Sequence, residues 1–333
     1  MTVASRESLS ASQIADALAS VVGVQHVLTG DAINEDLRHD EALTATPQAP
    51  LAVVRPADTE QVAAVVRWAA GNGVPVTARG SGTGLSGACV PRADGLLIDF
   101  SRMAKVLEID ADNHVAVVQP GITLAELDLA TAEHGLVYTV FPGESSASLG
   151  GNVATNAGGM RAVRYGVTRH QVLGLTAVLG TGEVMRTGGR FVKSSSGYDL
   201  TQLLIGSEGT LALATEITLR LHPRFAHSST VLAPFATLDE VAKAVPRIVN
   251  THLQPTILEY IDVLSMGSIA ANAGLELGIS ADVKDKTFAY LVVVLEQTTN
   301  DRLDEDTVQL GELLSELGAL DVFVLPSGAG AAL

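Results

Sequence analysis

The sequence predicts an α+β protein, and three observations support this prediction. From residue 47 to 223, short apolar runs typical of strands alternate with segments that carry a helical apolar face. Three glycine-rich loops interrupt this region, beginning with "RGSGTGLSG" at residues 79–87. After residue 224 glycine becomes sparse, and strands and helices follow one another as in two βαβ-like units of a ferredoxin-like sandwich. We therefore expect an N-terminal helical segment (1–46), a first domain (47–223) and a second domain (224–333).

Capping signals predict where the helices of the first domain begin and end. Asp58 is the N-cap of a helix that has Gln61 as its box partner and Gly73 just past its end. Thr123 and Glu126 form a T-x-x-E capping box for a second helix. The predicted strands of this domain are "LAVVRP", "VPVTAR", "LLIDF", "KVLEID", "HVAVVQP" and a hairpin that turns at residues 180–182.

The second domain is predicted as alternating strands and helices. The strands are "STVLAPF", "TILEYID", "TFAYLVVVLEQT" and "LDVFVLP", and the helices begin at Thr237 and Asp301 and cover about residues 264–273. The sequence then ends in "SGAGAAL", which contains no closing element. The ferredoxin-like domain is therefore expected to be incomplete.

Composition excludes several classes of protein. The chain has 333 residues, 47% of them hydrophobic and 17% charged, which suits well-packed domains. Its net charge of -16 argues against binding to nucleic acid or an anionic membrane, because both need clustered Lys and Arg. The single cysteine, Cys89, excludes an intrachain disulfide and indicates a reducing compartment. With no signal-peptide pattern and no long apolar run, we expect a cytoplasmic protein without a transmembrane segment.

The first glycine loop is suited to binding a phosphate, because glycine leaves backbone amides accessible and reaches unusual backbone angles. Gly82, Gly84 and Gly87 match G-x-G-x-x-G, but a Rossmann turn continues directly into a helix and has an acid about 20 residues on. Here a proline follows, and Asp99 comes only 12 residues after Gly87. No Gly-Lys-Ser/Thr closes a P-loop either. The loop therefore predicts a phosphate site in another fold, with a flexible linker as the alternative.

The three glycine loops together favour a dinucleotide ligand. The second loop, residues 141–166, adds amide and hydroxyl side chains that can bond to a polar ring or a ribityl chain: Ser145, Ser148, Asn152, Thr155 and Asn156. The third loop contains Gly206 and Gly209. A ligand long enough to meet all three loops, with a diphosphate at the first, is a dinucleotide.

Three long segments resemble a known family: "VVRPADTEQVAAVVRWAAGNGVPVTARGSGTGLSG", "PGESSASLGGNVATNAGGMRAVRYG" and "KSSSGYDLTQLLIGSEGTLALATEITL". They are similar to the PCMH-type FAD-binding domain of the flavin-linked oxidases that include vanillyl-alcohol oxidase. The resemblance is strongest to the branch with the FAD subunit of glycolate oxidase, D-lactate dehydrogenase and D-2-hydroxyglutarate dehydrogenase. It covers about residues 47–223 and continues more weakly through "EYID" and "LVVVLEQT". It implies a two-subdomain FAD-binding domain followed by an incomplete ferredoxin-like substrate domain.

The resemblance also implies residue roles. The pyrophosphate is expected to be wrapped by Arg79, Gly80, Ser81, Gly82, Thr83, Gly84, Leu85 and Ser86. The flavin and ribityl region is expected at Pro142, Gly143, Ser148, Gly150, Gly151, Asn152, Thr155, Asn156 and Gly158. The rest of the cofactor is expected at Glu208, Gly209, Thr210 and Ile217. Some relatives tether FAD through a histidine near the first loop, which has none here, so we expect noncovalent FAD.

The activity implied is oxidation of D-lactate, glycolate or D-2-hydroxyglutarate to the 2-oxo acid, with hydride transfer to flavin N5. Electrons would pass to a quinone, an electron-transfer protein or oxygen. This reaction needs a base near the hydroxyl and a cation for the carboxylate. In the related dehydrogenases a substrate-binding arginine, a metal motif and an acid–histidine pair follow the last strand seen here, and we expect this region to be absent.

Catalytic residues stay unknown from the sequence. The histidines show no H-x-H or H-x-x-x-H pairing, so no metal site is expected. Polar residues near the cofactor motifs are candidates for contacts with substrate, with phosphate or with backbone: Arg161, Arg164, Tyr165 and Lys193. The alternative to an enzyme is a truncated, noncatalytic FAD-binding fragment or a subunit that needs a partner. A homodimer is also open.

Overall fold

The computed structural model describes residues 10–274 and 277–325, and these form two compact units. Unit 1 consists of Met1–Ala157 and Val167–Pro223, and unit 2 of Gly158–Gly166 and Arg224–Leu333. The short segment Gly158–Gly166 thus belongs to unit 2, although the chain on both sides of it belongs to unit 1. The terminal "SGAGAAL" and the first nine residues lie outside the described residues.

The first sheet of unit 1 has the strand order β1-β2-β4-β3. β2 (Ala52–Val54), β4 (Leu96–Asp99) and β3 (Val76–Arg79) are parallel, and β1 (Val27–Leu28) pairs antiparallel with β2. Helix α1 (Ala11–Val22) packs Ile14, Leu18 and Val22 into the core that it shares with β2 and α2 (Thr59–Asn72). The segment 1–46, expected to stand by itself, thus contributes helix α1 to this core. β1 was not predicted, because a strand of two residues is too short to show the alternation of apolar and polar side chains that identifies a strand.

Helix α2 shows how local signals set a boundary. Asp58 accepts a hydrogen bond from the Gln61 backbone N–H at 2.8 Å, and Gly73 ends the helix with φ +67°. The Gln61 side chain accepts from Ala57 N, one residue before the N-cap, so the predicted capping box is not formed. The apolar face of α2 is buried, as predicted: Val62, Val65, Val66 and Ala69.

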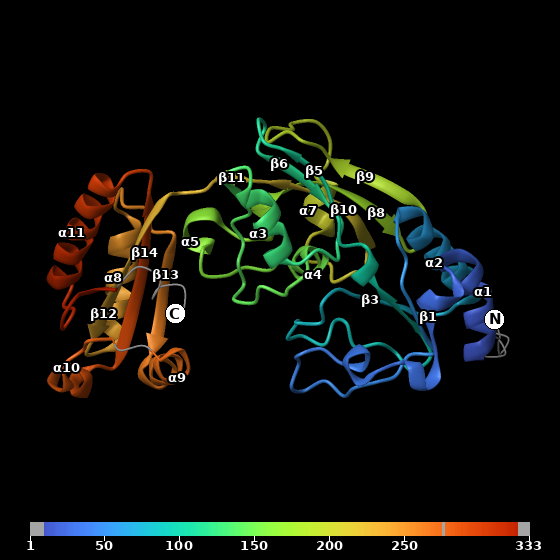
Figure 1. Cartoon of the computed structure of the whole chain (residues 1–333), viewed down its shortest axis with the longest axis horizontal. Coiled ribbons are helices and arrows are strands. Elements are labelled where there is room, and N and C mark those ends of the chain that lie inside the picture. The colour runs from blue at the N-terminus through green and yellow to red at the C-terminus, as the bar shows by residue number, and fades with distance from the viewer. Residues whose placement is uncertain (1–9, 275–276, 326–333) are drawn as a thin grey trace. The chain divides into compact units, whose positions relative to one another are not determined.

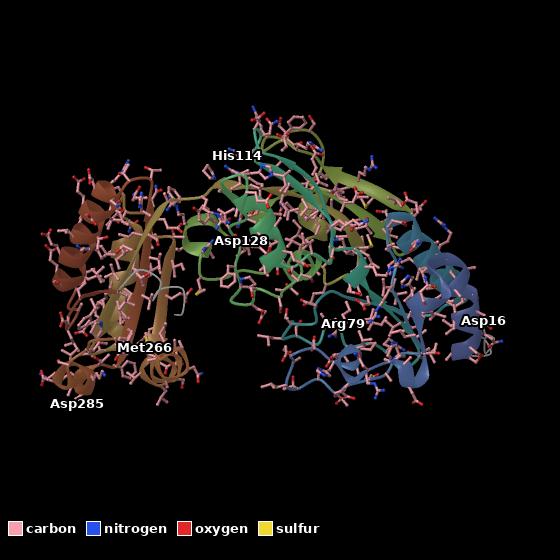
Figure 2. All side chains as sticks on the ribbon, viewed as in Figure 1. Asp16, Arg79, His114, Asp128, Met266 and Asp285 are labelled. Carbon is pink, nitrogen blue, oxygen red and sulfur yellow. The ribbon has the colours of Figure 1, made fainter. Side chains whose placement is uncertain are left out.

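The second sheet of unit 1 is antiparallel, in the order β5-β6-β10-β8-β9. Its strands are β5 (Val106–Asp110), β6 (Val115–Val118), β10 (Ala212–Arg220), β8 (Val172–Leu179) and β9 (Val184–Gly188). His114, in the β5–β6 turn (Figure 2), has φ +54°. α3 (Leu124–Ala132) and α4 (Leu149–Thr155) pack on this sheet, and Thr123 forms the predicted capping box with Glu126. Val178 and Leu213 of this sheet join the core of the first one, so the two subdomains pack together.

Short elements complete unit 1. They are α6 (Thr168–Gln171), α7 (Leu200–Leu204), the pair β7 (Leu136–Val137) and β11 (His222–Pro223), and the 3₁₀ helices η1 (Val24–His26), η2 (Gly30–Ala32), η3 (Glu35–Arg38) and η4 (Phe100–Arg102).

Unit 2 is an antiparallel sheet in the order β13-β14-β12-β15 with helices on both faces (Figure 1). Its strands are β12 (His227–Phe235), β13 (Ile257–Asp262), β14 (Ala289–Gln297) and β15 (Phe323–Leu325). α8 (Leu238–Val249) and α11 (Asn300–Glu316) cover one face, and α9 (Val263–Ala273) and α10 (Ala281–Lys286) cover the other. α5 (Ala162–Tyr165) lies beside β13. All four strands of a ferredoxin-like βαββαβ pattern are therefore present, with α9 and α10 inserted before β14.

Within the described residues, no helix is both long and apolar enough to cross a membrane.

Two leucines of α3 test the packing of unit 1. Leu127 is fully buried and Leu129 is 72% exposed, so the same change at both positions separates packing from helix propensity. Leu127→Ala is expected to lower the free energy of unfolding by about 2–5 kcal/mol, because it leaves a cavity. Leu129→Ala is expected to change it by less than about 0.5 kcal/mol. Urea denaturation followed by the fluorescence of the single tryptophan, Trp68 in α2, measures both; equal losses would contradict the packing described.

Candidate functional site

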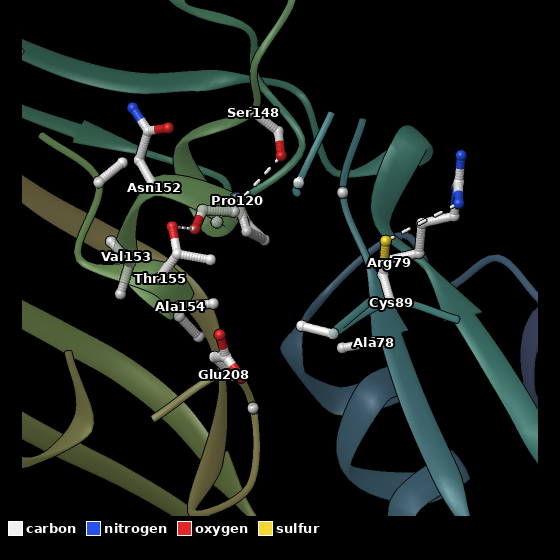
Figure 3. A pocket seen from close by; sticks show the side chains of 18 of the residues that line it. Ala78, Arg79, Cys89, Pro120, Ser148, Asn152, Val153, Ala154, Thr155 and Glu208 are labelled. Carbon is white, nitrogen blue, oxygen red and sulfur yellow. Dashed lines mark hydrogen bonds between the residues drawn. The ribbon is translucent and has the colours of Figure 1, made fainter. Parts of the chain in front are cut away.

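A cavity of about 560 Å³ lies within unit 1 and is lined by all three glycine loops (Figure 3). The first loop follows β3, the second leads into α4, and the third lies between α7 and β10. A volume of this size is typical of sites for small molecules and cofactors.

Most of the residues proposed from the sequence lie on the wall of this cavity. They are Arg79, Gly80, Ser81, Gly82, Thr83, Gly84, Leu85, Ser86, Pro142, Ser148, Gly150, Gly151, Asn152, Thr155, Glu208 and Gly209. Residues from three separate stretches of sequence are thus brought together in one place.

Five proposed residues are not among those that line the cavity. Ile217 is fully buried in the core of the second sheet, and Gly158 belongs to unit 2. Asn156 ends α4 at φ +50°, and its side-chain oxygen accepts from Arg169 N at 3.0 Å. The Thr210 hydroxyl donates to Ser207 O at 2.6 Å. Gly143 directly follows Pro142, which does line the cavity, and has φ +96°. For Ile217, Asn156 and Thr210 these contacts indicate roles in holding the fold.

The first and second loops approach so closely that only glycine fits at residue 80, where a Cβ would lie 2.0 Å from Ser148 Oγ. The second loop also lies close to the residue after β6, since a Cβ on Gly150 would lie 2.7 Å from Pro120 Cβ. Ser148 Oγ accepts from Ser81 N at 3.2 Å, and Ser81 Oγ accepts from Ser148 N at 3.0 Å. This reciprocal pair joins the first loop to the start of α4.

The third loop is joined to the first by one side-chain contact. Ser86 Oγ donates to Glu208 Oε1 at 3.2 Å, and Glu208 N donates to Ala154 O at 2.8 Å. Glu208 has φ +51°, a conformation that non-glycine residues adopt rarely and that is often found at functional sites.

Three polar side chains meet at the first loop: Asp40 and Arg79, which are buried, and Cys89, which is half-buried. Figure 3 shows Arg79 beside Cys89. Arg79 is 8% exposed; its Nη1 donates to His39 O at 2.5 Å and lies 3.8 Å from Cys89 Sγ. The Cys89 thiol in turn donates to Asp40 Oδ2 at 3.7 Å. Burial raises the pKa of Cys89 to about 11; Arg79 opposes this shift and Asp40 adds to it. The cysteine is therefore a protonated thiol at neutral pH.

Sequence reasoning missed part of the wall. Asp40 comes from a polar stretch that carries no motif, and apolar residues such as Phe100, Leu175 and Leu204 look like ordinary core positions. Asp99, considered above as a Rossmann acid, accepts from Arg55 Nε at 2.7 Å and from Ser101 N at 2.9 Å, so its carboxylate is used within the fold.

The donors of the cavity fit a polar cofactor such as FAD. Asn152 is 3% exposed, lines the cavity, and its buried Nδ2 has no hydrogen-bond partner within the described chain. A buried amide donor of this kind is costly unless a ligand accepts from it. Among the described residues, no group of three or more His, Cys, Asp or Glu side chains is arranged to hold a metal.

The pKa of Cys89 gives a pH-dependent expectation. Alkylation by iodoacetamide at pH 8 should be about 100-fold slower than for free cysteine, because only the thiolate reacts. The rate should rise about tenfold per pH unit up to pH ~10. Asp40→Asn removes a nearby negative charge, so it should lower the pKa of Cys89 and speed the reaction at pH 8. The exposed control Asp31→Asn should leave the rate unchanged, and fast alkylation of the unaltered chain at pH 7 would contradict the burial described.

Two family models match this chain. The FAD binding domain model covers residues 50–188, and the model for the C-terminal domain of FAD linked oxidases covers residues 224–332. An uncharacterized FAD-linked oxidoreductase of Mycobacterium tuberculosis is 58% identical over 96% of this chain and 69% of its own length. A D-lactate dehydrogenase of Anaerostipes hadrus is 38% identical over 92% of this chain and 65% of its own. The glycolate oxidase subunit GlcD of Bacillus subtilis is 39% identical over 71% and 51%.

Solved structures with low sequence identity share the fold. Alkyldihydroxyacetonephosphate synthase superposes with a TM-score of 0.81 at 20% identity, covering all of this chain and 64% of that one. p-Cresol methylhydroxylase superposes with a TM-score of 0.78 at 18% identity, covering 94% and 65%. The PCMH-type fold expected from the sequence is thereby confirmed. With its two matching domains and its close relatives, the chain belongs to the family of FAD-linked oxidoreductases.

Proposed function

We propose that this protein oxidises a small D-2-hydroxy acid to the 2-oxo acid with FAD held in the cavity of unit 1. The observation that carries the proposal is the convergence of three glycine loops on one cavity within the domain that matches the FAD binding family. Relatives named D-lactate dehydrogenase, glycolate oxidase subunit and D-2-hydroxyglutarate dehydrogenase support the substrate class, at 38%, 39% and 44% identity. D-Lactate, glycolate and D-2-hydroxyglutarate are therefore the acids to test.

The residues of the cavity have separate tasks in this proposal. Backbone amides of Gly80 to Gly84 hold the pyrophosphate, which allows a chain of net charge -16 to bind an anion. Asn152 and Ser148 face the flavin and ribityl region from α4. The bound cofactor supplies the two-electron oxidation, while the protein positions the substrate and excludes water.

The cofactor is proposed to be noncovalent. No histidine lines the cavity in the described part of the chain. Cys89 does line it, but its raised pKa keeps it a poor nucleophile. The electron acceptor, whether a quinone, an electron-transfer protein or oxygen, and the cytoplasmic location stay predictions.

The cofactor and the reaction are tested together on the purified chain. We expect a visible flavin spectrum, release of intact FAD on mild denaturation, and reduction of an artificial dye by at least one of the three acids. Flavin that stays with the denatured chain would contradict noncovalent binding. FAD without dye reduction by any of the acids would contradict the dehydrogenase and favour an FAD-binding chain that needs a partner subunit.

Gly82→Asp tests the pyrophosphate site. Gly82 has φ +82°, and a Cβ there would lie 2.0 Å from Arg79 Nη2. The variant adds strain, bulk and a negative charge where the pyrophosphate is proposed, so FAD content should fall at least about tenfold. Gly135→Asp is the matched control, because Gly135 has φ +67°, open space around it and no place in the cavity wall. Full flavin content in Gly82→Asp would place the phosphate elsewhere.

A further inference from the structure

Residues 39–41, between η3 and β2, contact the first glycine loop although they lie far from it in the sequence. Each of the three residues makes one contact, and the contacts are spread from the start of the loop to just past its end. In the order of the loop they are Arg79 Nη1 to His39 O at 2.5 Å, Glu41 N to Gly84 O at 2.9 Å, and Cys89 Sγ to Asp40 Oδ2 at 3.7 Å. We call residues 39–41 the loop strap.

The loop strap is itself fixed to the first sheet of unit 1. It directly follows η3, whose Leu37 is buried in one core with Val53 of β2 and Leu97 of β4. Its own turn is closed by Asp40 Oδ1, which accepts from Ala42 N at 3.1 Å. The strap therefore gives the loop a second support, separate from the one that α4 provides.

The glycine loop needs support from outside, because it makes few hydrogen bonds of its own. From Gly82 to Ser86, no backbone amide donates to another residue in the part of the chain that the structure describes. Such unpaired amides can bind an anion, but a segment without internal hydrogen bonds loses conformational entropy when a ligand orders it. Contacts that order the loop beforehand reduce this loss and so strengthen binding.

Asp40 is the member of the strap whose side chain acts on the loop. It is 5% exposed and lines the cavity, and a Cβ on Gly84 would lie 3.8 Å from its Oδ2. One carboxylate oxygen closes the strap on Ala42 N, and the other accepts from the thiol of Cys89. A buried carboxylate needs partners of this kind. The acid at the wall of a proposed anion site is thus bonded to the chain that surrounds the loop.

We propose that Asp40 is a positioning residue for the cofactor, and that the loop strap holds the first glycine loop in the shape that receives the pyrophosphate. The inference rests on the proposed function, in which this loop binds FAD, and it gives a role to a polar stretch that carries no motif. The alternative is that Ser148 alone sets the loop and that the strap only covers it.

Binding is measured by calorimetric titration of the purified chain, with any flavin removed, using FAD, ADP and riboflavin. FAD and ADP carry two linked phosphates, and riboflavin carries none. Asp40→Ala should weaken FAD and ADP binding at least about tenfold and leave riboflavin binding within about twofold. Asp31→Ala, an exposed position in η2, is the control and should change none of the three affinities.

Asp40→Asn separates positioning from charge. The variant keeps the shape of the side chain and the acceptor for Ala42 N but removes the negative charge. It should therefore bind FAD within about threefold of the unaltered chain. If Asp40 acted on the pyrophosphate only by repulsion, Asp40→Asn and Asp40→Ala would both bind FAD more tightly, and that result would overturn the proposal.

Hydrogen exchange of the flavin-free chain tests the strap without any ligand. The Glu41 amide is protected by Gly84 O, and the Ser81 amide by the contact with α4. Asp40→Ala should speed exchange of the Glu41 amide at least about tenfold, because release of the strap opens this bond. Amides of α3 should exchange as in the unaltered chain, which checks that unit 1 stays folded. Should Asp40→Ala fail this check, Cys89→Ala removes the other partner of the same contact and should weaken FAD binding about threefold.

The outcome is distinguishable from failure of the proposed function. If the unaltered chain binds FAD and the folded Asp40→Ala variant binds it equally well, the strap is overturned and the proposed function stands. Equal losses for FAD and riboflavin would also overturn the strap, because its effect would not depend on the pyrophosphate. If the unaltered chain binds no FAD, the proposed function fails, and exchange of the Glu41 amide still decides whether Asp40 holds the strap on the loop.

Discussion

The close approach between the first glycine loop and the start of α4 is the constraint on which the cavity depends. At Gly80 there is no room for a Cβ, and the reciprocal hydrogen bonds of Ser81 and Ser148 hold the two backbones at that distance. Because Ser148 is also the N-cap of α4, the same side chain that starts the helix fixes the loop beside it. The wall of the pocket is thus held here by contacts between loop backbone and two serine side chains, at a distance that only glycine permits at residue 80.

The electrostatics of the chain follow from this arrangement. A protein of net charge -16 repels anions at a distance, so an anionic cofactor must be held by local dipoles and by few, well-placed cations. Arg79 is buried behind the loop, bonded to the backbone of His39 and close to Cys89. Its position supports the loop from behind, and Gly82 leaves the space that the guanidinium occupies. In unit 2, the ring of Phe225 and the buried hydroxyl of Thr256 hold the guanidinium of Arg164.

The second glycine loop is divided between the two units. Its first part, up to Ala157, builds the wall of the cavity in unit 1, whereas Gly158–Gly166 packs with unit 2. One continuous motif therefore supplies side chains to two separate tasks. Asn152 and Thr155 lie on the cavity wall, while Arg164 contacts Tyr165 and Thr256.

The elements that could be predicted from the sequence are those marked by capping residues or by a run of apolar residues. The apolar face of α2, its capping residues Asp58 and Gly73, the Thr123–Glu126 box and the strands of unit 2 were predicted, because each depends on residues within one or two turns; the Gln61 half of the box predicted for α2 was wrong. β1 and α10 were missed, since two residues and the charged run "ADVKDK" carry no periodicity and form only against neighbours. The site divides in the same way. The glycine loops were recognisable from their motifs, but the positions of Asp40, Ile217 and Arg164 depend on contacts between residues far apart in the chain. The sequence by itself determined where the glycine loops lie, because glycine leaves the backbone amides accessible. Only the tertiary structure decided which polar side chains meet, because burial and hydrogen bonding between distant segments have no local signal in the sequence.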